Sequence, residues 1–172
     1  MSNIKIYLGH FENQSGAITI GDPCYSKDSE CVINKVVAQQ GTWKAHLLID
    51  KKTVERQSLF VHHEDYPVRS NATMGHLFRR VAVDSGQLCV HDSRYWGKKS
   101  AVPKGFMSDV ALKFDCDDPW YKMHCKITLY TEDHVDVTPF GAVSATAYGD
   151  GNYFVEAIKK NGKLVALRVH LV

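Results

Sequence analysis

The stretch FVEAIKKNGKLVALRV, residues 154–169, predicts a β-hairpin near the end of this 172-residue chain. Two strand-like runs flank Asn161-Gly162, and this dipeptide accepts the two positive φ angles of a type I′ turn. Such a turn matches the twist of the strands that it joins. We therefore expect the runs on either side to pair.

Alternation of apolar and polar residues, rather than helical spacing, dominates the rest of the chain. It is clear in residues 43–50 and 121–129, which both show the period of two that is typical of half-buried strands. Further strands are expected at Ile4–Leu8, Ala17–Ile20, Leu59–His62, Phe78–Val83, Gln87–Val90, Val110–Phe114, Ala142–Ala147, Tyr153–Ile158 and Leu164–Val172. The pattern predicts a mainly β fold, an antiparallel β-sandwich or open barrel with one or two short helices, in a single domain of residues 1–172.

Two segments predict helices. The stretch YSKDSECVINKVVAQQG offers polar capping residues from Ser26 onward and ends at Gly41, so a short helix is expected there. A second helical turn is expected to begin at Asp118, with Pro119 at its first position. No internal repeat is expected.

Composition limits the functional classes. The net charge is +2 and the basic residues are scattered, so we expect no partner among DNA or RNA duplexes. No apolar run is long enough to span a bilayer, and the first residues do not resemble a secretory signal, so we expect a cytoplasmic protein without membrane contact. The five cysteines contain no C-x-x-C pair and are expected to be reduced thiols.

Three apolar runs end in an aspartate within two residues of a glycine: ITIGDPCY at 18–25, VAVDSGQL at 81–88 and TAYGDGNY at 146–153. If Asp22, Asp84 and Asp150 meet, their carboxylates suit a divalent cation, or one of them suits a general base. The competing interpretation is turn chemistry, because aspartate in such positions forms Asx-turns.

No other residues complete a catalytic or metal set. Cys89 and His91 are two apart and share a strand face, but zinc needs two further ligands that no spacing supplies. Cys24, at a predicted helix N-terminus, suits a nucleophile, yet no particular histidine is indicated as its base. Ser85 lacks the glycines of a nucleophile elbow. We therefore expect no metal and no cofactor.

Aromatic residues next to these turns suit a flat ligand such as a nucleobase. They are Tyr25, Tyr95, Trp96, Tyr148 and Tyr153. Arg94 lies next to Tyr95 in the sequence, and its guanidinium group can bind a phosphate.

The motifs GDPCY, VAVDSGQLCVHD followed by YW, and AVSATAYGDGNYFVEAIKKNGKLVALRVHLV resemble a family known as domain of unknown function 4241 and similar uncharacterised bacteriophage proteins. The resemblance covers most of the chain in order. It implies a β-rich fold, a phage protein that acts in the host cytoplasm, and a shared feature made by Asp22, Cys24, Tyr25, Asp84, Ser85, Gly86, Gly149, Asp150, Gly151 and Tyr153.

We expect a non-catalytic binding protein, which sequesters a host signalling nucleotide or inhibits a host defence protein. Its expected ligand-binding residues are Asp22, Cys24, Tyr25, Asp84, Ser85, Arg94, Trp96, Asp150 and Tyr153. One alternative is a hydrolase of a nucleotide-like substrate, with a metal held by the aspartates or with Cys24 as the nucleophile. Another is a structural or dimeric accessory protein.

Overall fold

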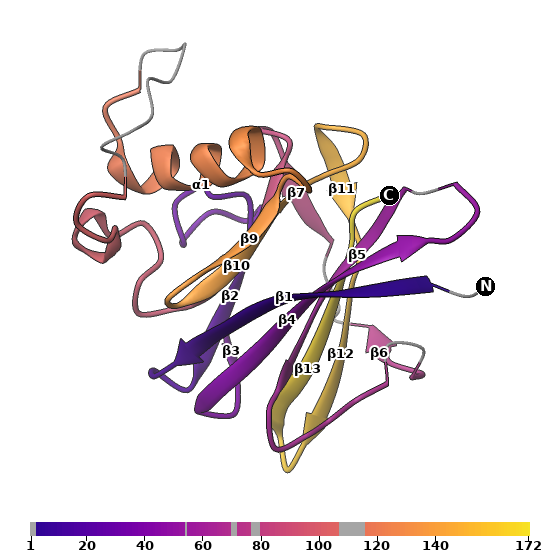
Figure 1. Ribbon diagram of the computed structural model, residues 1–172. Coiled ribbons are helices and arrows are strands. Elements are labelled where there is room, and N and C mark those ends of the chain that lie inside the picture. The colour runs from indigo at the N-terminus through magenta and orange to yellow at the C-terminus, as the bar shows by residue number, and fades with distance from the viewer. Residues whose placement is uncertain (1–2, 54, 70–71, 77–79, 107–115) are drawn as a thin grey trace.

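The computed structural model describes residues 3–53, 55–69, 72–76, 80–106 and 116–172. The strands form three antiparallel sheets, and one α-helix lies across the outside of one of them (Figure 1). The described strands make open sheets and not a closed barrel. The chain is mainly β, as the alternating pattern predicts.

The larger sheet has six strands. In spatial order they are β1 (Asn3–Asn13), β4 (Gly41–Asp50), β5 (Arg56–His63), β13 (Lys163–His170), β12 (Val155–Lys160) and β6 (Gly75–His76). The predicted hairpin is confirmed, because β12 pairs with β13 and both turn residues have positive φ, 50° at Asn161 and 75° at Gly162.

The second sheet has five strands, and two further strands form a small ribbon. The five are β3 (Ile33–Val37), β2 (Ala17–Gly21), β8 (Gln87–Asp92), β10 (Gly141–Ala145) and β9 (Val135–Thr138), and the ribbon pairs β11 (Gly151–Tyr153) with β7 (Val81–Val83). Most predicted strands are thus confirmed. Val110–Phe114 lies outside the described residues, as does part of Phe78–Val83.

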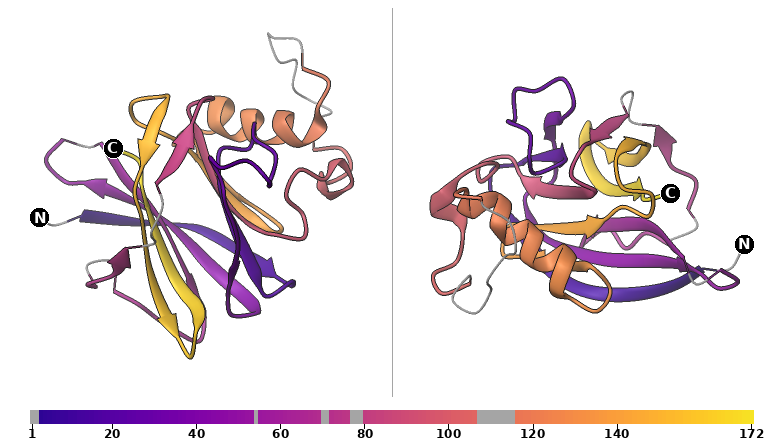
Figure 2. Two further views of the ribbon diagram at one scale, coloured as in Figure 1. Left: turned by 180° about the vertical axis from the view of Figure 1, so that it is seen from behind. Right: turned by 90° about the horizontal axis from the view of Figure 1, so that it is seen from above.

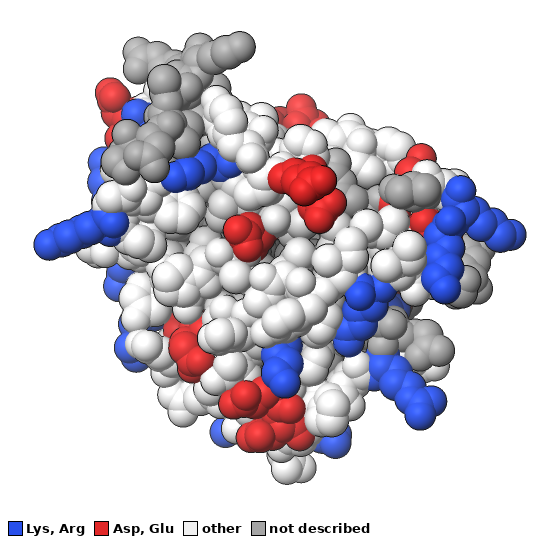
Figure 3. Space-filling model, viewed as in Figure 1, with Lys and Arg blue, Asp and Glu red and all other residues white. Residues whose placement is uncertain are grey.

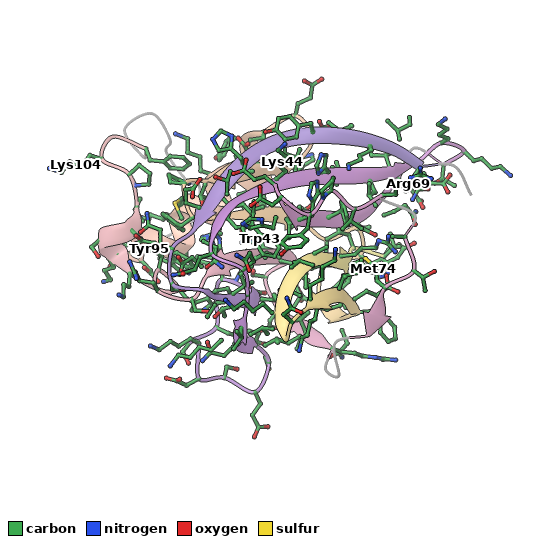
Figure 4. The ribbon with its side chains drawn as sticks, turned by 90° about the horizontal axis from the view of Figure 1, so that it is seen from below. Trp43, Lys44, Arg69, Met74, Tyr95 and Lys104 are labelled. Carbon is green, nitrogen blue, oxygen red and sulfur yellow. The ribbon has the colours of Figure 1, made fainter. Side chains whose placement is uncertain are left out.

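The main core lies between the two large sheets (Figure 2). Trp43 of β4 is fully buried at its centre and donates its indole N–H to the Gln39 carbonyl oxygen at 3.0 Å (Figure 4). Ile20 of β2 and Leu88 of β8 belong to the same buried cluster. Each such side chain stabilises the fold by about 1.5–3 kcal/mol through burial.

The helix α1 (Pro119–Tyr130) occupies residues that the sequence predicts as a strand, so that prediction is wrong. The predicted helix start is confirmed, because Asp118 is the N-cap and its carboxylate accepts a hydrogen bond from the Trp120 N–H at 3.0 Å. Trp120, Met123 and Ile127 recur at helical spacing and pack on the outer face of the five-stranded sheet. The segment therefore has both periods. Asp118 and Pro119 favour the start of a helix, and the packing of its apolar face on the sheet selects the helix over the strand.

The helix predicted within residues 25–41 is also wrong. Residues 23–32 form turns, and residues 33–37 form β3, which pairs with β2. Its β-branched residues Ile33, Val36 and Val37 favour a strand once a partner strand is available. A short 3-10 turn, η1 (Lys99–Ala101), lies in the loop after β8. Within the described residues, no helix has the length and apolar character needed to cross a membrane.

Candidate functional site

The buried carboxylate of Asp22 joins two turns. Asp22 follows β2 and is fully buried, and its Oδ1 accepts the backbone N–H of Cys24 at 2.9 Å in an Asx-turn. Its Oδ2 accepts the backbone N–H groups of Asp84 and Ser85 at 2.8 and 2.7 Å, and the Ser85 hydroxyl donates to Oδ1 at 2.6 Å. Asp22 therefore fastens the turn after β2 to the turn before β8.

The third glycine–aspartate turn lies beside the second. The backbone N–H of Thr146 donates to the Gly86 carbonyl oxygen at 2.9 Å, and a Cβ placed on Gly86 would lie 3.6 Å from the Gly149 Cα. The three turns that end the predicted runs thus meet at one edge of the fold.

The carboxylates of the three turns nevertheless differ in burial and in hydrogen bonding. Asp84 and Asp150 are exposed, whereas Asp22 is buried and accepts four hydrogen bonds. Those four bonds use the acceptor positions of an ionised carboxylate, so Asp22 has none left for a cation. At Asp22 the turn interpretation, and not the metal interpretation, matches the geometry.

A second aspartate repeats the arrangement of Asp22. Asp92 ends β8, is fully buried, and accepts the backbone N–H of Arg94 at 2.8 Å through Oδ1. Its Oδ2 accepts the backbone N–H groups of Gln14 and Ser15 at 2.7 and 3.0 Å. Asp92 thus fastens the turn after β8 to the turn before β2.

The two arrangements come from an internal repeat, so the expectation of none is wrong. SGAITIGDPCY at 15–25 and SGQLCVHDSRY at 85–95 share Ser-Gly, an alternating strand, aspartate and tyrosine at the same spacing. The copies pair with each other across β2 and β8, with the equivalent residues Ile20 and Val90 directly opposite. Each aspartate therefore holds the Ser-Gly turn of the other copy, about a local two-fold axis.

A concave site lies beside the DPCY turn. This pocket, which we call the DPCY pocket, has a volume of about 410 Å³. It is lined by Pro23, Cys24, Tyr25, Ser26, Lys27, Asp28, Trp96, Gly97, Asp118 and Trp120. Three separate segments build it: the turn after β2, the turn after β8 and the start of α1.

Two buried indoles hold the wall of the DPCY pocket. Trp96 donates its N–H to the Tyr25 carbonyl oxygen at 3.1 Å, and Trp120 donates to the Pro23 carbonyl oxygen at 3.2 Å. Both rings are almost fully buried, so they shape the pocket and present little face to a ligand. Tyr25 is only half-buried, and the charged residues Lys27 and Asp28 are exposed at the rim.

The thiol of Cys24 is not activated. Burial, and then the hydrogen bond and charge of the Asp22 carboxylate, raise the pKa of Cys24 to about 12. The thiol is therefore protonated at neutral pH, whereas a nucleophilic cysteine needs a lowered pKa. The predicted helix N-terminus that would lower it is a turn instead.

The DPCY pocket gathers Cys24, Tyr25 and Trp96 from the predicted site residues. Asp22 and Ser85 do not line the pocket, but the hydrogen bond between their side chains supports the DPCY turn that forms its wall. Arg94 is exposed in the second repeat and donates to the Gln14 side chain at 3.5 Å, in the turn before β2.

The remaining predicted residues do not line this pocket. Tyr153 is 4% exposed, and its hydroxyl donates to the Gly149 carbonyl oxygen at 2.7 Å, so it is a packed ring. Asp150 is exposed in the third turn. Ser85 does line a smaller pocket of about 210 Å³ between its turn and α1, together with Gly86, Gln87, Tyr121, Cys125, Thr128, Leu129 and Ala145.

Sequence reasoning missed Asp92, Asp118 and Trp120. The repeated Ser-Gly and Asp-x-x-Tyr spacing is a signal for Asp92 in the sequence itself. No local feature of the sequence indicates that Asp118 and Trp120 line a pocket, because they reach it only through the packing of α1 on the sheet.

Acidic and basic side chains are interspersed on the face of the molecule that Figure 3 shows, and no continuous stripe of one sign crosses it.

Comparison with protein-family models, with curated proteins and with solved structures finds no match. The resemblance to domain of unknown function 4241 therefore stays a prediction. The fold and the pocket define the chain as a β-sandwich with a polar surface pocket between two strand-end turns and a helix.

Proposed function

We propose that this protein binds a small polar ligand, of nucleotide-like chemistry, in the DPCY pocket without transforming it. The observation that carries the proposal is the meeting of three chain segments around a pocket of about 410 Å³. This volume is in the range of small-molecule sites, which are about 300–1,000 Å³. The indole hydrogen bonds to the backbone at Pro23 and Tyr25 hold the wall in place before a ligand arrives.

The lining favours a ligand with a ring and charged or hydrogen-bonding groups. Tyr25 offers a partly exposed ring beside the pocket, and Lys27 offers an ammonium group for a phosphate or carboxylate. Asp28 and Asp118 supply carboxylate acceptors for ribose hydroxyls or a base edge. A small nucleotide combines all three kinds of group.

Catalysis has less support than binding. A metal-dependent hydrolase requires carboxylates that are free to coordinate, and Asp22 uses its oxygens for four hydrogen bonds. A cysteine hydrolase requires a thiolate, and the pKa of Cys24 is raised to about 12. Binding without turnover suits a protein that sequesters its ligand.

Thermal unfolding with a panel of mono-, di- and cyclic nucleotides tests the proposal. A nucleotide at 100 times its Kd is expected to raise the Tm of a domain of this size by about 5–10 °C. Lys27→Ala and Tyr25→Ala should abolish the shift. Lys163→Ala, an exposed lysine in the β12–β13 hairpin, is the matched control and should keep it.

The state of the recovered compound separates binding from catalysis. After incubation with the wild-type protein and release by heat, the nucleotide should be recovered intact. A hydrolysed product would favour the hydrolase. If no nucleotide changes the Tm, or if Lys27→Ala and Lys163→Ala respond alike, the assignment of this ligand class to the pocket is wrong.

A further inference from the structure

A cluster of three metal-ligating side chains lies between α1 and the five-stranded sheet, outside the DPCY pocket. Cys89 and His91 point from the outer face of β8, and His124 points from α1. One ligand atom from each residue lies within 4.8 Å of the others, and all three residues are fully buried. Nothing in the proposed function uses these residues.

His124 is held in the tautomer that a metal ligand needs. Its Nδ1 lies 2.7 Å from the Trp120 carbonyl oxygen, which can only accept, so Nδ1 carries the proton. The lone pair is then on Nε2, which faces His91. Metal-ligating histidines are commonly oriented in this way, with the second ring nitrogen donating to a backbone carbonyl.

His91 can present its own lone pair to the same point. Its Nε2 lies 2.7 Å from the His124 Nε2, a hydrogen-bonding distance that places a proton between them. The other nitrogen, Nδ1, is buried without a hydrogen-bond partner among the described residues. The His124 Nε2 lone pair is the one acceptor among the described residues that holds the proton on His91 Nε2, so transfer of this proton to Nδ1 gives up a single hydrogen bond.

The thiol of Cys89 and the carboxylate of Asp22 provide the charge that a cation needs. The Cys89 Sγ donates to the Gly21 carbonyl oxygen at 3.2 Å, and Asp22 is the next residue along the chain. Asp22 is fully buried and has no ion pair with a described cationic side chain. A bound cation would offset the negative charge of the Cys89 thiolate and the Asp22 carboxylate, with one thiol proton released to solvent.

We propose that Cys89 Sγ, His91 Nε2 and His124 Nε2 bind one thiophilic metal ion, of the class of Zn²⁺ or Cu⁺. Metal–nitrogen bonds of about 2.0–2.1 Å require the two Nε2 atoms to separate to about 3.3 Å, a small opening from their present distance. Thiolate with imidazole is the ligand set that selects these ions. The ion would fasten α1, and with it the wall of the DPCY pocket, to the sheet.

The surroundings of the cluster are apolar. Trp120, Phe140 and Trp96 surround the His91 ring at centroid distances of 5.1, 5.4 and 6.2 Å. Their apolar rings shield the cluster from water. Three protein ligands leave a bound Zn²⁺ one open coordination position, because structural zinc sites have four protein ligands.

Metal analysis of the purified full-length protein tests the site. Protein dialysed against a chelator is titrated separately with Zn²⁺, with Cu⁺ under reducing conditions, and with Co²⁺ as a spectroscopic probe. We expect one ion per chain, a thiolate-to-cobalt charge-transfer band, and a higher Tm with the bound ion.

Variants assign the ligands. Cys89→Ser, which preserves shape, should remove the charge-transfer band and weaken binding by at least about 100-fold. Cys125→Ser is the matched control, because Cys125 is a buried thiol on α1 outside the cluster. Circular dichroism reports whether each variant is folded. If the folded wild-type protein binds none of the three ions with one-to-one stoichiometry, or if Cys89→Ser binds as the wild type does, the proposal is wrong.

Discussion

Replacement of Asp22 by asparagine should cost a large part of the stability of this fold. The substitution keeps the size of the side chain and exchanges one acceptor oxygen for an NH₂ group. If the remaining oxygen keeps the Cys24 N–H and the Ser85 hydroxyl, the NH₂ group faces the backbone N–H groups of Asp84 and Ser85. These lie 2.8 and 2.7 Å from the present oxygen, so two donors lose their acceptor.

The magnitude follows from those two donors. A buried polar group without a partner costs about 1–3 kcal/mol, which gives about 2–6 kcal/mol for two. Both hydrogen bonds are only partly buried, so water recovers some of this loss and about 2–4 kcal/mol is expected. The total stability of a domain is about 5–15 kcal/mol, so the variant should remain folded but be clearly weakened.

Urea denaturation followed by circular dichroism measures the effect. Asp84→Asn is the matched control, because its side chain is exposed, and it should change the free energy of unfolding by less than about 0.5 kcal/mol. Asp92→Asn, the equivalent change in the second repeat, should behave like Asp22→Asn. A loss below about 1 kcal/mol for Asp22→Asn, or one equal to that of Asp84→Asn, would show that Asp22 does not join the two turns.

Three further predictions follow from single residues. Gly141→Ala should destabilise the fold by more than about 3 kcal/mol, because the new Cβ would overlap the His91 ring. The Cβ of Gly75→Ala meets only the Ala157 carbonyl oxygen, at an ordinary contact distance of 3.7 Å, so this change should be close to neutral in the same urea assay. Burial, and then the charge of Lys5, lower the pKa of His46 to about 4. Neutral His46 therefore contributes its full stabilisation above pH 6.5, and this stabilisation is lost as the pH falls from 6.5 toward 4. The free energy of unfolding should fall over that range by less than about 1.4 kcal/mol per pH unit. His46→Phe should flatten this dependence in urea titrations at several pH values, and an unchanged slope would count against the shift. Cys24, although exposed, should react with iodoacetamide at pH 8 roughly 10- to 100-fold more slowly than an ordinary thiol, because its pKa is raised to about 12 and the smaller thiolate fraction is only partly offset by greater nucleophilicity. Peptide mass spectrometry follows the reaction, and equal rates in the folded and the urea-unfolded chain would contradict this.

Local signals in the sequence predict those parts of the fold that depend on neighbouring residues. The Asn161-Gly162 turn and the Asp118-Pro119 helix start are both local, and both are confirmed. The alternation of strands such as β4 also survives, because one face of each strand packs against the core.

The wrong secondary-structure predictions concern segments whose conformation depends on contacts with distant parts of the chain. Residues 121–129 have both a strand period and a helical face, and only the packing of Trp120, Met123 and Ile127 on the sheet shows which face is buried. The β3 segment has capping residues before it, but its pairing with β2 overrides them.

In the candidate site, too, the features that the sequence does not predict depend on contacts between distant segments. The convergence of the DPCY and VDSG turns on Asp22 depends on the antiparallel pairing of β2 with β8, which the sequence reveals only through the repeat. His124 approaches Cys89 and His91 because α1 crosses the outer face of β8, and no spacing in the sequence encodes that crossing.

The most direct test of the central claim, that the DPCY pocket binds a small nucleotide-like ligand, is amide NMR of the labelled wild-type protein titrated with the nucleotide panel. We expect at least one nucleotide to shift the amide signals of residues 24–28 and 96–97 and of Asp118 and Trp120 in a saturable way, and to leave the hairpin at residues 160–163 unchanged. Shifts confined to other surfaces, or none with any nucleotide, would contradict it.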